Sequence, residues 1–205
     1  MHSAATAALM DQLWPPGDET GNRRAFAIVD AARDEEIYPS LSAADCPWSC
    51  LYRGDAAVRM AEVAPYLVEL DPASAYTVWL LDRAWGNSWG IFLTAATTPE
   101  ILRGHLRRLV MVQLPDGKTV YFRFYDPRVL GNYLPTCLPA ELRTVFGPVE
   151  RFLLEQDDGT AAVLFRRAGD ALIETRIGEI AGRDLDVRGW LRAEGVRFAK
   201  LGDGA

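Results

Sequence analysis

The first half of the chain alternates short apolar runs with segments of helical periodicity. The apolar runs are typical of buried strands, and they cover residues 25–30, 48–53, 66–70 and 89–95. The helical segments between them cover residues 3–13, 34–44, 55–64 and 74–84. The clearest helix start is at Thr98, a residue type that caps helices, and Pro99 and Glu100 follow it. These patterns predict strands and helices in alternation.

Two hairpins are predicted in the second half of the chain. Apolar strands flank Pro115-Asp116-Gly117 and again Asp157-Asp158-Gly159, which are turn sequences because glycine accepts a positive φ. The predicted strands cover residues 110–114 and 119–125 in the first hairpin, and 152–156 and 161–166 in the second. Short helices are expected at 127–133 and 139–146. The whole pattern indicates an α+β (mixed α/β) fold, in which helices flank a mixed sheet that contains hairpins.

Composition narrows the class of protein. The chain has 205 residues, of which 49% are hydrophobic, and this length suits one domain with a modest extension. Its net charge of -6 opposes a general role in binding nucleic acid or anionic membranes, which requires a basic surface. No window reaches the roughly 18 apolar residues that span a bilayer, and the N-terminus does not resemble a secretory signal. We therefore expect a cytoplasmic protein without membrane or nucleic-acid partners.

The residues that common catalytic mechanisms need are scarce. A serine or cysteine nucleophile usually needs a histidine base, and His105 lies on the apolar stripe of its predicted helix. A packed, hydrogen-bonded histidine is the favoured interpretation. Cys46 and Cys50 are separated by three residues rather than two, and Cys137 is distant, so structural thiols are favoured over a metal site. We expect no catalytic residue, metal or cofactor.

One alternative is a metal-dependent enzyme. Asp30, Asp71 and Asp126 stand at the ends of predicted strands, where carboxylates can gather around a magnesium ion or act as an acid/base pair. Aspartate also caps helices and turns, and Asp126 followed by Pro127 fits an N-cap with proline at the first helical position. The structural interpretation is therefore favoured.

A second alternative is a module that binds single-stranded nucleic acid. Tyr121, Arg123 and Tyr125 alternate along one face of the predicted strand 119–125, and aromatic residues with arginine can stack on bases. The acidic composition of the chain opposes this function. A strand buried on both faces is the favoured interpretation.

An ordered set of motifs resembles one bacterial family. The motifs are AIVDAARD (27–34), CLYRG (50–54), YLVELD (66–71), WLL (79–81), WGNSWGIFL (85–93), HLRRL (105–109), LPDGKTVYFRFYDPRVL (114–130), LPT (134–136) and FGPV (146–149). With these motifs in this order, the chain resembles the domain-of-unknown-function 4123 family of type VI secretion effector adaptors or chaperones. The resemblance implies a non-enzymatic protein of a Gram-negative cytoplasm that binds a toxic effector and promotes its loading onto a VgrG-type spike protein.

The resemblance also suggests how the chain is organised. We expect an N-terminal helix and loop (1–24), the family lobe (25–149) and a variable C-terminal hairpin and tail (150–205). The candidate residues of the lobe, which either define the fold or bind a partner, are Trp85, Ser88, Trp89, Gly90, Arg123, Tyr125, Asp126 and Arg128. The tail mixes apolar and basic residues, and its candidates for effector binding are Trp190, Leu191, Arg192 and Phe198.

Overall fold

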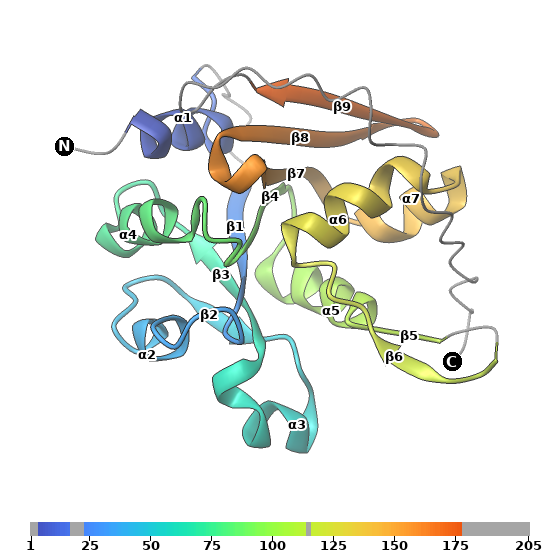
Figure 1. The fold of residues 1–205 in the computed structure, drawn as a ribbon, viewed down its shortest axis with the longest axis horizontal. Helices are drawn as coiled ribbons and strands as arrows, with labels where there is room; N and C mark the ends of the chain where they lie inside the picture. Colours follow the sequence, from blue (N-terminus) through green and yellow to red (C-terminus); the bar gives the residue numbers. More distant parts are fainter. Residues whose placement is uncertain (1–3, 17–22, 114–115, 178–205) are drawn as a thin grey trace.

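One antiparallel sheet forms the centre of the protein. The structure is a computed structural model that describes residues 4–16, 23–113 and 116–177. Its seven-stranded sheet has the order β2-β3-β1-β4-β7-β8-β9 (Figure 1). The strands are β1 (Arg24–Asp30), β2 (Trp48–Cys50), β3 (Pro65–Leu70), β4 (Gly90–Ala95), β7 (Val149–Gln156), β8 (Ala161–Ala168) and β9 (Ala171–Ile177).

The predicted α+β class is confirmed, and the pairing in the sheet is antiparallel throughout rather than mixed. The strand β1 lies between β3 and β4 and opposes both of them. The strands β3 and β4 therefore run in the same direction and are connected along the chain by α4, but β1 separates them in the sheet.

Helices cover both sides of the central strands. In the view of Figure 1, α1, α2 and α4 lie to the left of β1, whereas α5, α6 and α7 lie to its right. The helices are α1 (Ala4–Leu13), α2 (Ile37–Leu41), α3 (Gly54–Arg59), α4 (Ala75–Ala84), α5 (Pro99–Leu109), α6 (Pro127–Tyr133) and α7 (Pro139–Phe146). Every residue of β4 is buried, and so is every residue of β1 after Arg24. This burial explains why both strands are continuous apolar runs rather than alternating patterns.

Among the described residues, α4, α5 and α6 begin at side-chain caps. Ser74 Oγ accepts a hydrogen bond from Thr77 N at 3.1 Å at the start of α4. Thr98 Oγ1 accepts one from Ile101 N at 3.4 Å at the start of α5, as its position before Pro99 predicts. Local sequence signals therefore place these boundaries correctly. The predicted helix at 34–44 is shorter in the structure, and the one at 55–64 is divided into α3 and a 3-10 turn, η1 (Ala61–Val63).

The predicted strand 119–125 is wrong beyond Tyr121. The strands β5 (Met111–Gln113) and β6 (Thr119–Tyr121) form a separate two-stranded sheet. The chain then turns, and Asp126 N donates to Arg123 O at 3.0 Å. Phe124 and Tyr125 are both buried, so neighbouring side chains are buried here as expected for a strand buried on both faces, but in a turn rather than in a strand.

The second predicted hairpin is confirmed, and it belongs to the main sheet. The strands β7 and β8 pair around η3 (Asp157–Gly159), and β7 also pairs with β4. The hairpin therefore continues the sheet of the predicted lobe across the division at residue 149. The edge strand β9 was not predicted; four of its seven residues are exposed and none is buried. The tail candidates Trp190, Leu191, Arg192 and Phe198 lie outside the described residues.

Candidate recognition surface

The WGNSWG loop between α4 and β4 is held by the β7–β8 hairpin. The carboxylate of Glu155, on β7, accepts hydrogen bonds from Gly86 N at 2.7 Å, Ser88 N at 2.8 Å and Ser88 Oγ at 2.9 Å. The indole Nε1 of Trp85 donates to Gly159 O at 2.8 Å. Glu155 itself is buried. Four hydrogen bonds thus fix a loop to residues that lie about seventy positions later in the chain.

Glycines are required where this loop approaches the sheet. Gly86 has a φ of +82°, a conformation that glycine adopts without steric cost. Gly90 is in close contact with β1, because a Cβ atom there would lie 1.9 Å from Ile28 O. Trp85 and Trp89 are also buried. The candidates in this loop are therefore buried and held by contacts within the fold.

A buried carboxylate at the end of β1 holds an exposed arginine. Asp30 is 2% exposed, and one of its carboxylate oxygens accepts a hydrogen bond from the Arg123 guanidinium. Its other oxygen accepts from Ala32 N at 3.1 Å, which fixes the turn after β1. Arg123 lies in the turn after β6, and its side chain is 46% exposed. Tyr125, two residues further along the chain, is buried.

A second buried carboxylate holds a second arginine in the same way. Asp126 caps α6 by accepting a hydrogen bond from Arg128 N at 3.0 Å, which confirms the predicted cap. The Arg128 guanidinium also donates two bonds to it, Nε to Oδ1 at 2.9 Å and Nη2 to Oδ2 at 2.5 Å. Burial raises the pKa of Asp126, but the hydrogen bonds and charge of Arg128, together with the charge of Arg33, outweigh this and lower it.

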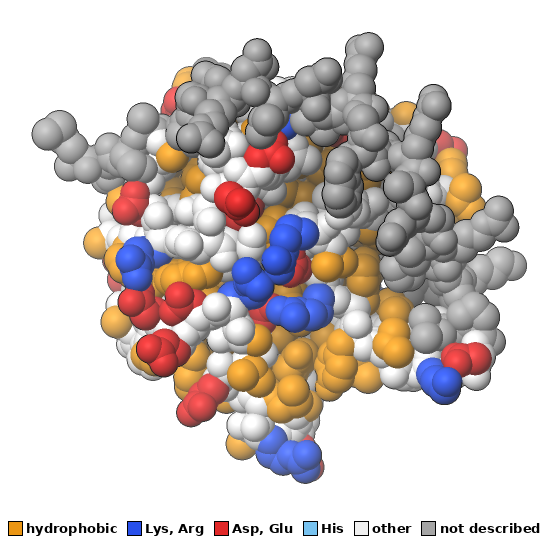
Figure 2. All heavy atoms as spheres, viewed as in Figure 1, with side chains coloured by type: hydrophobic (Ala, Val, Ile, Leu, Met, Phe, Trp, Pro, Cys, Tyr) orange, Lys and Arg blue, Asp and Glu red, His pale blue; other side chains and the backbone are white. Residues whose placement is uncertain are grey.

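Arg123 and Arg128, with Arg33, whose charge acts on Asp126, form what we call the arginine patch. Arg33 is exposed in the turn after β1, where its backbone N donates to Asp30 O at 2.9 Å. Among the described residues its guanidinium has no ion-pair partner. Figure 2 shows basic side chains gathered near the middle of this face of the molecule. Two of the eight candidates of the lobe, Arg123 and Arg128, are therefore exposed, and the other six are buried.

The structure does not assemble the predicted acidic site. Asp30 and Asp126 each hold an arginine, and Asp71 Oδ1 accepts a hydrogen bond from Ala73 N at 2.8 Å in a turn. Over residues 4–16, 23–113 and 116–177, no three His, Cys, Asp or Glu side chains are grouped so as to hold a metal ion. All three aspartates thus have structural partners.

The predicted stacking face for nucleic acid is also not formed. Tyr121 is 49% exposed and its ring centroid lies 5.5 Å from that of Tyr52. Tyr125 is buried, because the chain turns after β6 instead of continuing as a strand. The three side chains predicted to alternate on one face therefore do not share one.

His105 is packed as predicted, Cys46 is buried, and Cys50 and Cys137 are half-buried. His105 is buried on α5, and its Nε2 lies 3.0 Å from Val145 O. A Cβ atom at Gly147 would lie 2.3 Å from the His105 ring, which explains why glycine follows Phe146 in the FGPV motif. The three cysteines are free thiols, and burial raises the pKa of Cys137 to about 11. A neutral thiol of this kind is a poor nucleophile.

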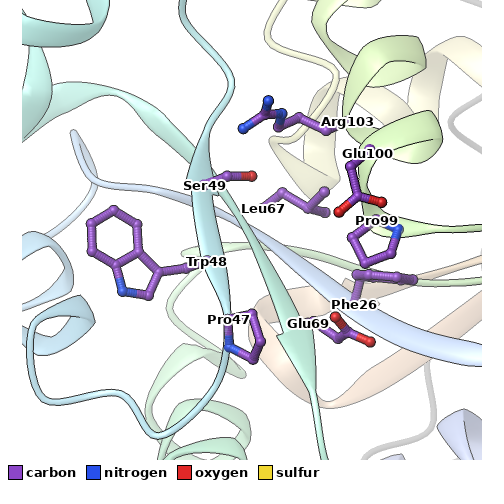
Figure 3. A pocket seen from close by; sticks show the side chains of 9 residues that line it. All are labelled: Phe26, Pro47, Trp48, Ser49, Leu67, Glu69, Pro99, Glu100 and Arg103. Carbon is purple, nitrogen blue, oxygen red and sulfur yellow. The ribbon is translucent and has the colours of Figure 1, made fainter.

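A hollow of about 270 Å³ lies between α5 and the strands β1, β2 and β3. Figure 3 shows Glu100 and Arg103 of α5 facing Ser49 and Leu67 across it. Phe26 and Leu67 give it apolar walls, and Glu69 contributes a further charge. Ser49 contributes a hydroxyl group to the lining, but no histidine lines the hollow to act as its base. The hollow therefore lacks the serine–histidine pair of an activated nucleophile.

Comparison with known proteins identifies the family. Residues 25–144 match the family model described as Domain of unknown function (DUF4123). This match covers more than half of the chain, so the protein belongs to the DUF4123 family. Searches of curated proteins and of solved structures gave no significant match.

The matched region ends before Glu155 and Gly159, although both hold the WGNSWG loop within it. Sequence reasoning identified the loop but missed Glu155 and Arg33. The available signal for Glu155 was a charged residue directly after the apolar run 152–154, where a buried carboxylate needs hydrogen-bond donors.

Within the part of the chain that the structure describes, every helix is too short or too polar to cross a membrane.

Proposed function

We propose that the protein is a non-catalytic cytoplasmic adaptor of type VI secretion. It binds a toxic effector and promotes the loading of that effector onto a VgrG-type spike protein. The observation that supports this most directly is the division of the family motif into a buried framework and exposed arginines. Asp30 and Asp126 hold Arg123 and Arg128 at the surface, an arrangement that suits recognition of another protein rather than catalysis.

The two binding roles are assigned to different parts of the chain. The arginine patch belongs to the region that the family shares, so it is the candidate contact for the spike protein. Residues 150–205 lie beyond the family match and are the candidate contact for the particular effector. The β7–β8 hairpin joins these two parts of the chain structurally, because Glu155 and Gly159 hold the WGNSWG loop of the shared region.

Pairwise binding tests this function. The protein is co-expressed with the product of each neighbouring gene and purified through a tag, and the co-purified proteins are identified. The expected result is stoichiometric recovery of one effector and, separately, of one spike protein. Recovery of neither, from a protein that elutes as a folded species, contradicts the function. Stoichiometric binding of magnesium or manganese in a calorimetric titration would instead support the metal-dependent enzyme.

A further inference from the structure

The arginine patch retains unused hydrogen-bond donors. Each guanidinium has five N–H groups. Among the described residues, Arg123 directs one terminal nitrogen to Asp30, and Arg128 directs Nε and one terminal nitrogen to Asp126. The side chains of these two arginines are 46% and 59% exposed, and Arg33 is exposed as well. Each arginine can therefore donate further hydrogen bonds to an approaching acceptor.

The negative charges of the patch lie beneath its positive charges. Asp30 and Asp126 are buried, so a ligand that approaches from solvent meets the guanidinium groups first. The carboxylates also restrict the rotamers of Arg123 and Arg128 before any ligand arrives. This pre-organisation lowers the conformational entropy that binding costs.

An exposed aromatic side chain stands close to the patch. Tyr52 lies within electrostatic range of both Tyr121 and Arg123, and Tyr121 packs against Tyr52. Tyr121 presents an exposed ring on the β5–β6 hairpin. Tyrosine and arginine are among the residue types that are enriched where protein–protein binding energy is concentrated. The surface therefore combines charge recognition with apolar contact area.

We propose that the arginine patch binds a short acidic segment of the protein partner, whose carboxylates pair with Arg33, Arg123 and Arg128. This inference rests on the proposed adaptor function and adds the chemistry of the recognised segment. Carboxylates match the planar guanidinium in bidentate geometry. The segment is short because the basic area is small. Asp34, Glu35 and Glu36 follow Arg33 and are acidic, so a long polyanion such as nucleic acid is repelled beyond the patch.

A fluorescent hexaglutamate peptide tests the proposal directly. Its binding is measured by fluorescence anisotropy with the full chain at low salt, beside a single-stranded oligonucleotide of similar charge. Hexaglutamate is expected to bind more tightly than the oligonucleotide, and increasing salt is expected to weaken its binding. Absence of hexaglutamate binding, or tighter binding of the oligonucleotide, would overturn the proposal.

Matched substitutions separate the patch from the overall charge of the protein. Arg33→Glu is expected to weaken hexaglutamate binding at least fivefold without unfolding the protein, since Arg33 has no ion-pair partner among the described residues. Arg59→Glu, on the exposed side of α3, changes the net charge equally and is expected to have less than a twofold effect. Equal weakening by both substitutions would show non-specific attraction and would overturn the proposal.

Two further comparisons complete the test. The double variant Arg123→Lys/Arg128→Lys keeps both charges beside the buried aspartates and is expected to remain folded but to bind hexaglutamate at least threefold more weakly. Unchanged binding in this folded variant would exclude a bidentate role. If the spike protein and the effector co-purify equally with wild type and Arg33→Glu, the acidic-segment proposal fails while the adaptor function stands.

Discussion

Glu155 is the residue on which the position of the WGNSWG loop depends most, and Glu155→Gln tests this dependence. One carboxylate oxygen accepts from Gly86 N and the other from Ser88 N and Ser88 Oγ, at distances of 2.7 to 2.9 Å. A glutamine amide has nearly the same shape but only one oxygen. Its NH₂ group therefore faces a backbone N–H, and at least one buried donor loses its acceptor.

The expected cost follows from that unsatisfied donor. A buried N–H without a partner costs about 1–3 kcal/mol. Burial raises the pKa of Glu155 although Ser88 and Gly86 donate hydrogen bonds to it, so the variant also avoids burying a charge. We therefore expect a net loss of about 2 kcal/mol in the free energy of unfolding, which lowers the melting temperature by about 4–8 °C for a domain of this size.

Thermal and urea denaturation, followed by circular dichroism, measure this loss. The matched control is Glu174→Gln, on the exposed edge strand β9, which is expected to change stability by less than about 0.5 kcal/mol. Hydrogen exchange adds local information, because the amides of Gly86 and Ser88 are expected to exchange faster in Glu155→Gln. A variant with wild-type stability and unchanged exchange at these two amides would refute the role assigned to Glu155.

Three other predictions follow from the structure, and a fourth follows from the sequence of the C-terminal tail. Gly90→Ala is expected to abolish or severely weaken folding because its Cβ would lie 1.9 Å from a carbonyl oxygen, whereas Gly104→Ala, with open space around it, is expected to melt at or above the wild-type temperature. Because burial lowers the pKa of His105, the neutral form is stabilised by folding, so stability should fall as the pH drops below about 6.5 and His105→Gln should reduce that fall in melts from pH 8 to 5. Asp126→Ala is expected to lose at least about 1 kcal/mol in thermal melts, since a helix cap is removed; an unchanged midpoint with lost partner binding would instead place Asp126 in an interface. Deleting residues 183–205 is expected to weaken effector binding in pull-downs while spike binding is kept, and unchanged effector affinity in the folded truncation would contradict this.

Local features of the structure could be predicted from the sequence. The starts of α5 and α6 depend on neighbouring residues, since Thr98 and Asp126 cap the turns that immediately follow them. The β7–β8 turn depends on the Asp157-Asp158-Gly159 sequence itself. In each case the stabilising contact joins residues that lie within a few positions of one another.

Features that depend on distant partners could not be predicted. Residues 119–125 alternate like a strand, but the pairing of Arg123 with Asp30, 93 positions earlier, accompanies a turn there. Glu155 gains its role only through Gly86 and Ser88, and no local pattern specifies that contact. The division of the family motif into buried and exposed residues likewise required the fold, because exposure is a property of the packed structure.

A three-component binding assay tests the adaptor function most directly. The spike protein is immobilised, and retention of the effector is measured with and without the full-length chain. The proposed function predicts that the effector is retained only when the chain is present. The acidic-segment proposal adds that Arg33→Glu reduces this retention while Arg59→Glu does not. Equal retention of the effector in the absence of the chain, or no retention in its presence, would contradict the function.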